Sequence, residues 1–438
     1  MYAIADIRRP LLQTGGLGSA ANHSKTVTRP TRIALIGNAL PRLCGLATFT
    51  SHVYDALVTC FPECSIDHYA MVDPGGHYCF PESVTRSIEQ TDVQSHRYAA
   101  QAIRASDADL IWVQHEFGIF GGPAGCYFLQ ILEQTDTPLA VSLHTVLETP
   151  DSDQREVIER IADRAALLIV MAERARSILI GSYGVCPAKI AVIPHGIPDR
   201  AYVEPALAQR CFGLEERPTI LTFGLLSPGK GIETMIEALP AILKRCPSAL
   251  YAVIGATHPH LLASENEAYR ERLQALATAL GVAGHVHWVN RFLCEADLLE
   301  RIAAADVYVT PYGNPAQITS GALAYAFGLG KPIVSTPYIH ACELLADGGG
   351  QLVSFGDVAG TAKAVANLLT DNPLRAKTAK IAYAHGRSMT WHNMVRHAMD
   401  HFALITAAAA PVPVSTARQA GYSNGATRQV ALEFAASY

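Results

Sequence analysis

The chain has few charged residues and no excess of positive charge. Of its 438 residues, 17% are charged, and 34 Lys and Arg stand against 39 Asp and Glu, a formal net charge of −5. Without a basic excess, we do not expect binding to the phosphate backbone of nucleic acid. Half of the residues are hydrophobic, which excludes a disordered or fibrous protein. The length predicts two or three domains at roughly 100–200 residues each.

Long apolar runs are also missing. The longest is Ala165–Ala172, which lies between Arg164 and Glu173 and falls far short of the roughly 20 residues that a membrane span needs. The first thirty residues lack the apolar core of a signal peptide. We therefore expect a cytoplasmic protein with no integral membrane segment. Residues 1–30 are expected to form a flexible lead, and residues 409–438 a flexible tail of low complexity. The pattern leaves the oligomeric state open.

The ten cysteines are scattered singly and form no CxxC pair, which predicts reduced thiols. Cys60, Cys64 and His68 recur every four residues, and on a helix this spacing would give a face of metal ligands. Pro62 would break such a helix, and Ser65–Met71 has the pattern of a strand. We therefore expect no metal site there.

Short apolar runs separated by helical stretches make up the rest of the chain. The expected strands of the first half are Arg32–Gly37, Leu110–Gln114, Leu139–Leu143, Leu167–Met171 and Ile190–Ile193. The pattern stops at residues 194–205 and resumes with Thr219–Phe223, Leu250–Ile254, His285–Val289, Val307–Thr310, Pro332–Ser335 and Gly350–Val353. The expected helices of the second half include Ile232–Arg245, Glu267–Leu280 and Glu295–Ala304. Such runs indicate parallel strands buried on both faces.

The fold class is therefore α/β, with two Rossmann-like domains whose parallel sheets face a central cleft. We assign residues 31–200 to the first domain and 201–390 to the second, followed by a helix over 391–408. Ligands of such sheets bind at the carboxyl ends of the strands. The residues just after each apolar run are therefore the candidates for a functional site.

Four candidate segments lie in the first half. Pro41–Thr48 holds Arg42 and Gly45 before a helix N-terminus that would favour an anion. Gln114–Gly122 combines His115 and Glu116 with glycines, and His144 ends another strand. Pro194–Asp199 reads as an interdomain hinge, and for His195 we favour a structural role. Ordinary turns, a solvated carboxylate and a buried histidine remain the alternatives for these segments.

Two segments of the second half suit a phosphate group. In Phe223–Glu233, Gly224 lies in a short loop and Lys230 opens a helix, so a point charge and backbone N–H groups come together. This is not a P-loop, because GxxxxGK[ST] is absent. In Tyr312–Gly321, Thr319 or Ser320 would cap a helix over Ala322–Gly328 and leave its first N–H groups free.

In this order, the six segments resemble the retaining, nucleotide-sugar-dependent glycosyltransferases of family four (glycosyltransferase group 1), which have the GT-B fold. The resemblance covers about residues 32–408. Three motifs carry it. Phe223–Gly231 resembles the family loop G-R-L-x-x-x-K-G, Tyr325–Val334 resembles E-A-x-A-x-G-x-P-V-V, and Glu343 with Gly348–Gly350 and Gly356–Asp357 resembles E-x-x-x-x-G-x-G-x-L-V-x-x-x-D. The helix from Trp391 resembles the terminal helix that crosses back to the first domain in this fold.

The sequence departs from the family pattern at three positions. The arginine that assists the loop lysine is Leu225 here. The two glutamates of the E-x7-E motif, which contact the donor sugar and the ribose, fall on Gln317 and Tyr325. Gln317 can still hydrogen-bond a sugar without charge, and Tyr325 has one hydroxyl that could donate a single bond.

The resemblance implies a retaining hexosyltransferase that moves a sugar from a nucleotide-diphosphate donor to a soluble carbohydrate or small-molecule acceptor, with no metal or other cofactor. It further implies roles for the candidate residues. Lys230, assisted by Arg42 and Gly224 and by the N–H groups of Gly45, Thr319, Ser320 and Gly321, would hold the diphosphate; His144 and Gln317 would contact the sugar; Tyr325, Arg291 and Phe292 would border the nucleoside; His115 and Glu116 would lie on the acceptor side.

Two other functions stay open. A glycoside phosphorylase on the same fold would use inorganic phosphate in place of the nucleotide, and the residues at positions 225 and 325 favour it. A non-catalytic sugar-binding descendant is the second alternative. An oxidoreductase is disfavoured because the first turn is not GxGxxG. A soluble acceptor is preferred because we find no strongly basic amphipathic helix.

Overall fold

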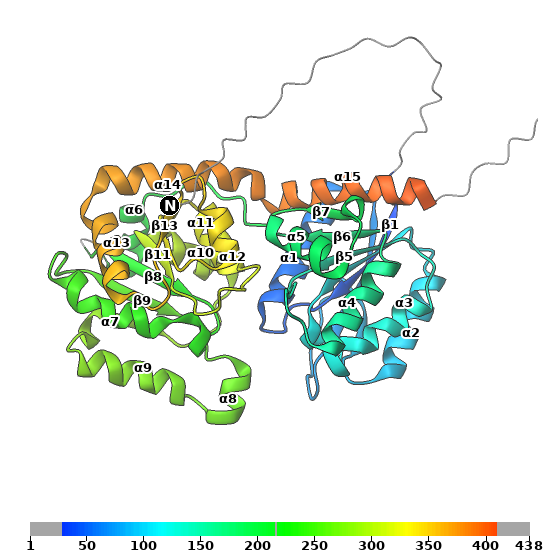
Figure 1. Cartoon of the computed structure of the whole chain (residues 1–438), viewed down its shortest axis with the longest axis horizontal. Coiled ribbons are helices and arrows are strands. Elements are labelled where there is room, and N and C mark those ends of the chain that lie inside the picture. Colours follow the sequence, from blue (N-terminus) through cyan, green and yellow to red (C-terminus); the bar gives the residue numbers. More distant parts are fainter. Residues whose placement is uncertain (1–28, 215–216, 410–438) are drawn as a thin grey trace, which may run out of the picture.

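The computed structural model describes residues 29–214 and 217–409. It contains two α/β domains, and the chain passes from the first to the second after β7 (Figure 1). Most of the predicted lead and the tail, except for residue 409, lie outside the described residues. Within the described part of the chain, no helix is both long and apolar enough to cross a membrane.

The first domain is built on a sheet of seven parallel strands in the order β3-β2-β1-β4-β5-β6-β7. Its elements are β1 (Arg32–Gly37), α1 (Gly45–Cys60), β2 (Ser65–Val72), β3 (Val84–Glu89), α2 (Val93–Ala105), β4 (Leu110–His115), α3 (Leu129–Glu133), β5 (Leu139–Leu143), α4 (Ser152–Arg164), β6 (Leu167–Val170), α5 (Glu173–Tyr183) and β7 (Ile190–Val192).

The second domain has a sheet of six parallel strands in the order β10-β9-β8-β11-β12-β13. Its elements are α6 (Pro205–Gln209), β8 (Thr219–Phe223), α7 (Ile232–Leu243), β9 (Leu250–Ile254), α8 (Pro259–Glu265), α9 (Ala268–Ala279), β10 (Val286–Val289), α10 (Glu295–Ala304), β11 (Val307–Thr310), α11 (Gly321–Gly328), β12 (Ile333–Ser335), α12 (Ile339–Leu344), β13 (Gly350–Leu352), α13 (Val358–Thr370) and α14 (Asn372–Gly386). Helix α15 (Trp391–Ala409) ends the described chain.

The predicted fold class is confirmed, and the predicted strands match the observed ones to within a residue or two at their ends. The sequence reasoning missed β3. Strand β3 is an edge strand in which only Ile88 is fully buried. It therefore lacks the continuous apolar run that marks the central strands.

Both sheets reverse their strand order once, between β1 and β4 in the first domain and between β8 and β11 in the second. The loops after these four strands diverge, which leaves a crevice at the carboxyl edge of each sheet. Glu116 follows β4, and the loop that carries Lys230 follows β8. The topology therefore directs the predicted site residues toward these two crevices.

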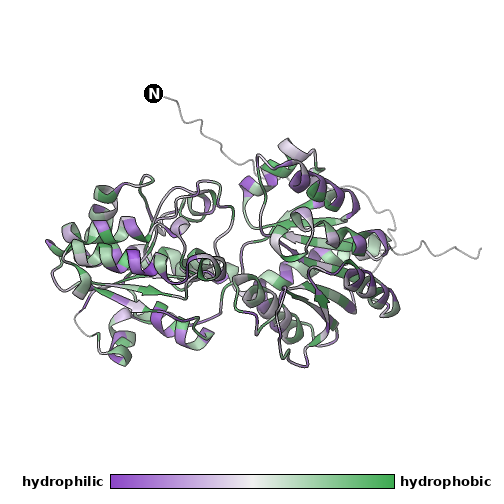
Figure 2. Cartoon of the chain, turned by 90° about the horizontal axis from the view of Figure 1, so that it is seen from below, coloured by the Kyte–Doolittle hydropathy of each residue, from purple (hydrophilic) through white to green (hydrophobic). Residues whose placement is uncertain are grey.

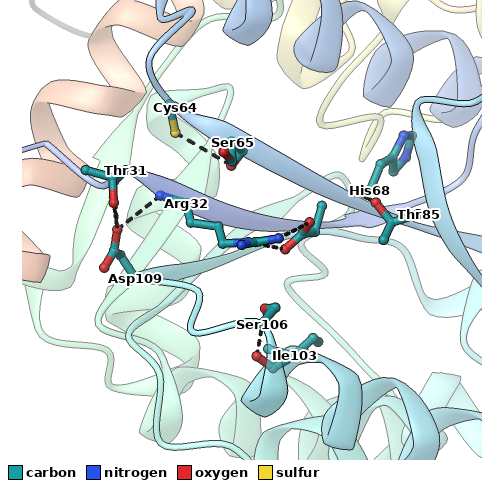
Figure 3. Close-up of polar contacts among 10 residues, drawn as sticks. Thr31, Arg32, Cys64, Ser65, His68, Thr85, Ile103, Ser106 and Asp109 are labelled. Atoms are coloured by element: carbon teal, nitrogen blue, oxygen red, sulfur yellow. Dashed lines mark hydrogen bonds and ion pairs between the residues drawn. The ribbon is translucent and has the colours of Figure 1, made fainter.

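Carboxylates at the opposite edge of the first sheet hold β1 between its neighbours (Figure 3). Asp109 accepts hydrogen bonds from the backbone N–H groups of Thr31 at 2.7 Å and Arg32 at 3.0 Å. The Arg32 guanidinium donates twice to Asp67, at 2.8 and 3.1 Å. This hydrogen-bonded pair raises the pKa of Arg32.

Helix α15 belongs to the core of the first domain although it follows the whole second domain in sequence. Figure 1 shows it running along the first domain, near α1. Its Phe402 packs edge-to-face on Trp112 of β4, with ring centroids 4.9 Å apart, and both side chains are fully buried. Figure 2 shows that, in both domains, the strands inside are apolar and the outer helices carry hydrophilic residues.

A carboxylate of the second domain caps a helix of the first. Helix α5 follows Ala172, which has no side chain able to accept the free N–H groups of its first turn. Glu343 of α12 accepts them instead, from Glu173 and Arg174 at 2.8 Å each. An anion at a helix N-terminus is favoured, so this contact stabilises the observed arrangement of the two domains.

Candidate active site

A cavity of 570 Å³ lies between the carboxyl edges of the two sheets, and we call it the central cavity. Ten of the sequence-predicted site residues line it, namely Gly45, Glu116, Gly224, Lys230, Phe292, Gln317, Thr319, Ser320, Gly321 and Tyr325. Residues of both domains therefore form its walls.

Lys230 is the only Lys or Arg among the described residues that line the central cavity. Its ammonium group lies 3.1 Å from the hydroxyl of Tyr312 and 4.2 Å from the centre of that ring. Burial opposes ionisation of Tyr312, but the Lys230 charge and several hydrogen bonds outweigh it, so the pKa of Tyr312 is lowered. This contact with Tyr312 restricts the position of the ammonium group at the end of the flexible Lys230 side chain.

The loop that presents Lys230 is joined to the segment after β11. The N–H of Gly313 donates to the carbonyl of Gly229 at 3.1 Å. Gly231 has φ +62°, and a Cβ atom at this position would lie 2.0 Å from the carbonyl oxygen of Pro311. Glycine is required there both for the left-handed backbone and for the close approach.

Two helix N-termini face the central cavity. At α11, the Ser320 side chain accepts from Leu323, and the N–H of Ser320 donates to Nδ1 of His340 at 2.9 Å. The predicted N–H group of Ser320 is therefore already used. Among the described residues, no acceptor takes the N–H groups of Gly321 and Ala322, nor that of Gly45 at α1.

Gln317 and Glu116 line the central cavity from opposite domains. The Gln317 amide nitrogen donates to the carbonyl of Thr319 at 2.5 Å, which orients the amide. Glu116 accepts from the Thr145 hydroxyl at 2.7 Å and from the N–H of Phe117 at 3.1 Å. Burial nevertheless raises the pKa of Glu116 above its usual value.

His144 lies beside the central cavity. Its ring meets that of Phe49, a lining residue, edge-to-face with centroids 4.6 Å apart. Its Nε2 lies 3.1 Å from the side-chain oxygen of Gln114. Burial, with smaller contributions from His195 and His115, lowers the pKa of His144 to about 3. The ring is therefore neutral at pH 7.

His115 and Arg42 do not line the central cavity. His115 is fully buried and stacks on Phe120, with centroids 5.6 Å apart, and no described residue bonds to either ring nitrogen. Burial lowers its pKa to about 3. The Arg42 guanidinium is directed to its own domain, 3.2 Å from Asn38 and 3.7 Å from Asp73.

A second cavity of 570 Å³, the side cavity, shares lining residues with the central cavity, among them Gly224 and Tyr325. Arg291 and Phe292 lie in its wall. At its border, His52 of α1 and Glu295 of α10 approach to 3.0 Å and form an ion pair between the domains when His52 is protonated. Tyr325 is buried, which raises its pKa.

Sequence reasoning missed several residues of the central cavity. His195, interpreted as structural, lines it, and its Nδ1–H donates to the carbonyl of Gly196 at 2.7 Å. Its Nε2 approaches Gly321 so closely that a Cβ atom there would lie 2.9 Å away. His258, Tyr312 and Trp391 also line the cavity. The position of His195 after β7 was the available signal.

Among the described residues, no group of three or more His, Cys, Asp or Glu side chains is close enough to hold a metal ion. The Cys60–His68 segment is divided, because α1 ends at Cys60 and β2 begins at Ser65. His68 is buried, which lowers its pKa to about 4.

Two facing parallel sheets with a cavity between their carboxyl edges define the GT-B fold. The chain matches the family model of glycosyl transferases group 1 over residues 210–385 and that of glycosyltransferase family 4 over residues 74–200. The chain belongs to the group 1 glycosyltransferases.

Curated relatives match part of the chain. The GDP-mannose-dependent α-(1-6)-phosphatidylinositol monomannoside mannosyltransferase of Mycolicibacterium smegmatis is 30% identical over 254 residues, 56% of this chain and 63% of the relative. The D-inositol 3-phosphate glycosyltransferase of Corynebacterium diphtheriae is 28% identical over 253 residues, 56% of this chain and 57% of the relative. The chain thus spans somewhat more than half the length of these relatives.

Solved structures resemble the chain over most of its length. Sucrose-phosphate synthase from Thermosynechococcus elongatus has a TM-score of 0.70 at 18% identity and covers 86% of this chain and 100% of its own. The Anabaena protein Alr3699/HepE in complex with UDP and glucose has a TM-score of 0.68 at 17% identity, with 85% and 100% covered. At this identity the likeness establishes the GT-B fold.

Proposed function

We propose that this chain transfers a hexosyl group from a nucleotide-diphosphate sugar to a soluble carbohydrate or small-molecule acceptor, with retention of the anomeric configuration. One observation carries the proposal. The central cavity brings Lys230, two helix N-termini and the Glu116 carboxylate together between the two sheets. The family membership of the chain supports it.

The diphosphate of the donor is placed against Lys230 and the free N–H groups of Gly45, Gly321 and Ala322. These groups stabilise the negative charge that develops on the leaving diphosphate as the bond to the anomeric carbon breaks. Because Leu225 occupies the position of the family arginine, Lys230 supplies the only full side-chain positive charge in this role. A cation and helix N-termini can do this without a metal ion, and we expect activity to survive chelation.

The acceptor hydroxyl approaches the anomeric carbon from the side of the leaving group. Its oxygen forms the new bond to carbon, and its proton passes to a diphosphate oxygen. Gln317 and His144 orient the sugar, and Glu116 is placed to accept a hydrogen bond from the acceptor. Holding both reactants in this geometry removes much of the entropic cost of their encounter.

The nucleoside is placed in the side cavity, beside Arg291, Phe292 and Tyr325. A relative named for GDP-mannose and a structural neighbour solved with UDP make guanine and uracil the first bases to test. The name of the inositol 3-phosphate relative supports a small soluble acceptor, whereas that of the phosphatidylinositol relative makes a lipid acceptor the contrasting outcome.

Thermal unfolding of the full chain with GDP, UDP, ADP or inorganic phosphate tests the donor site. A ligand at roughly 100 times its dissociation constant adds about 2.7 kcal/mol of stability. A shift with one nucleoside diphosphate is expected. A shift with inorganic phosphate alone that disappears in Lys230→Ala would favour a glycoside phosphorylase. The absence of any Lys230-dependent shift with the four compounds would favour the non-catalytic alternative.

Product analysis tests the reaction itself. The matching nucleotide sugar is incubated with inositol phosphate or with a simple sugar, and the anomeric coupling constant of the product is measured by NMR. Retention of the donor configuration is expected. An inverted product would contradict the mechanism, and transfer to phosphatidylinositol alone would contradict the soluble acceptor.

A further inference from the structure

A third cavity lies on the far side of the second domain, at the amino edge of its sheet, and we call it the back cavity. It measures 840 Å³ and shares no lining residue with the central or side cavity. Its walls come from the segments before β8, β11 and β12, from the interdomain linker, and from α6 and α14. Its size is typical of a small-molecule site.

A buried ammonium group lies in the wall of the back cavity. Lys331 is 1% exposed, and its Nζ donates to the carbonyl of Ala303 at 2.7 Å. Among the described residues, no second acceptor takes its remaining N–H groups. Burial lowers the pKa of Lys331 to about 7, against the opposing influence of Asp306 and Glu204. A pKa of about 7 leaves the Lys331 amine only partly charged at that pH, and a bound anion would supply the compensation that favours its charged form.

The acidic residue nearest the floor of the back cavity is already engaged within the fold. Asp306 accepts from the N–H of Thr219 at 2.8 Å and from the Gln209 amide at 2.9 Å. Arg375 lies 3.7 Å from this carboxylate. The Asp306 carboxylate therefore fixes the start of β8 and α6 through its hydrogen bonds, and it accepts none from Lys331.

Positive charge exceeds negative charge around the back cavity. Its wall contains Arg217, Lys331, Arg375 and Lys380 against Glu204 and Asp306. Arg375 donates from Nη1 to the last carbonyls of α13, at 3.1 and 3.0 Å, and no described residue accepts from its Nη2. A phosphoryl group, which carries nearly two negative charges at pH 7, suits such a set of donors.

Two aromatic rings complete the back cavity. Tyr202 and Tyr383 meet edge-to-face with centroids 5.6 Å apart. The Tyr383 hydroxyl donates to the carbonyl of Arg200 at 3.0 Å and accepts from the N–H of Tyr202 at 3.2 Å. These bonds hold both rings in place, so they offer a rigid face to the organic part of a ligand.

We propose that the back cavity binds a small phosphate ester, with its phosphoryl group on Lys331 and Arg375 and its organic part against Tyr202 and Tyr383. This site is separate from the central cavity, and the inference does not rest on the proposed function.

The test titrates glucose 6-phosphate and inorganic phosphate into the full chain, followed by calorimetry and by ³¹P NMR. Wild type and Lys230→Ala are expected to bind both compounds alike, in the millimolar range or tighter. Lys331→Met should weaken binding by about tenfold or more, because a charge-assisted hydrogen bond contributes roughly 1.5–3 kcal/mol. Lys380→Met, at an exposed position that does not threaten folding, should weaken it severalfold.

Lys377→Met is the matched control, because Lys377 is an exposed lysine of α14 that does not line the back cavity. It should leave both affinities unchanged. The proposal is overturned if neither compound binds at millimolar concentration. It is also overturned if Lys230→Ala abolishes binding while Lys331→Met and Lys380→Met leave it intact, since the phosphate would then lie in the central cavity.

Discussion

The role proposed for Lys230 depends on the residues around it. Leu225 on the same loop cannot share its charge, and Tyr312 directs its ammonium group toward the cavity. The free N–H groups at α1 and α11 contribute only partial charges. The proposed reaction therefore depends on this one lysine more strongly than it would in a site with two full cations.

Lys230→Ala should lower kcat/KM by about 10²–10³-fold, because loss of a donor to developing negative charge in a closed site costs that much. The thermal midpoint should hardly change, since no described acidic residue pairs with Lys230. Lys244→Ala, at an exposed position after α7, serves as the control. Full activity of Lys230→Ala in steady-state assays would refute the proposal that Lys230 stabilises the leaving diphosphate.

His115 links stability to pH. Its pKa is about 3 in the folded chain and about 6.5 when unfolded, so between these values the unfolded chain binds a proton that the folded chain excludes. Other buried histidines with lowered pKa values, such as His144 and His68, contribute losses of stability over the same pH range. The share of His115 is a loss of about 2 kcal/mol between pH 7 and pH 5, as pH falls below 6.5. His115→Phe, which matches the neighbouring phenyl rings, should remove this loss.

Chemical unfolding at pH 7 and pH 5 measures this difference. His77→Phe, at an exposed position, should keep the pH dependence of the wild type. An equal loss of stability in wild type and His115→Phe would show that His115 is not the group concerned. Because His115 lies outside the central cavity, His115→Phe should also retain transferase activity.

At the scale of elements, the loop between β8 and α7 is tightly constrained at Gly231. Gly231→Ala should destabilise the chain by about 2–4 kcal/mol, since Ala has to adopt a left-handed backbone and displace the Pro311 carbonyl. The thermal midpoint and kcat/KM should fall together, because the displaced loop carries Lys230.

Gly229→Ala is the control for Gly231→Ala, because a Cβ atom at Gly229 meets nothing within 4 Å. Calorimetry measures the thermal midpoint of both variants, and steady-state assays measure their kcat/KM. If Gly231→Ala behaved like Gly229→Ala in both measurements, the loop would be less constrained than the structure indicates.

The elements also show what the sequence can and cannot predict. Buried runs such as Thr219–Phe223 predict parallel strands because both faces of the sheet are covered, and the residues after them lie at the sheet edge for the same reason. Trp391 reaches the central cavity only because the two domains meet as they do. That placement depends on contacts between distant segments, so no local pattern reveals it.

At the scale of the whole molecule, Glu343 connects the second domain to the N-terminus of helix α5 in the first. Glu343→Ala should speed hydrogen exchange at the amides of Glu173 and Arg174 by about 2- to 30-fold, as expected for loss of a cap of 0.5–2 kcal/mol. Mass spectrometry of the α5 peptide measures the rate.

Glu148→Ala is the control for Glu343→Ala, because Glu148 pairs with the exposed side chain of Arg174 at 2.6 Å without touching the backbone of α5. A surface pair of this kind contributes little, so exchange in α5 should stay at the wild-type rate. Unchanged exchange in Glu343→Ala would mean that the domains are not held together through this cap.

The crossing of α15 has a consequence for the order in which the chain is synthesised. The ribosome delivers β1 to β7 first, yet the apolar side chains of α1 and the Trp112 ring remain uncovered until α15 emerges, after the entire second domain. Val395, Met399 and Phe402 of α15 pack in the same core as Ile33, Leu35 and Trp112. The first domain therefore begins to fold first and is completed last, and a nascent chain stalled before residue 391 exposes a hydrophobic face to its surroundings.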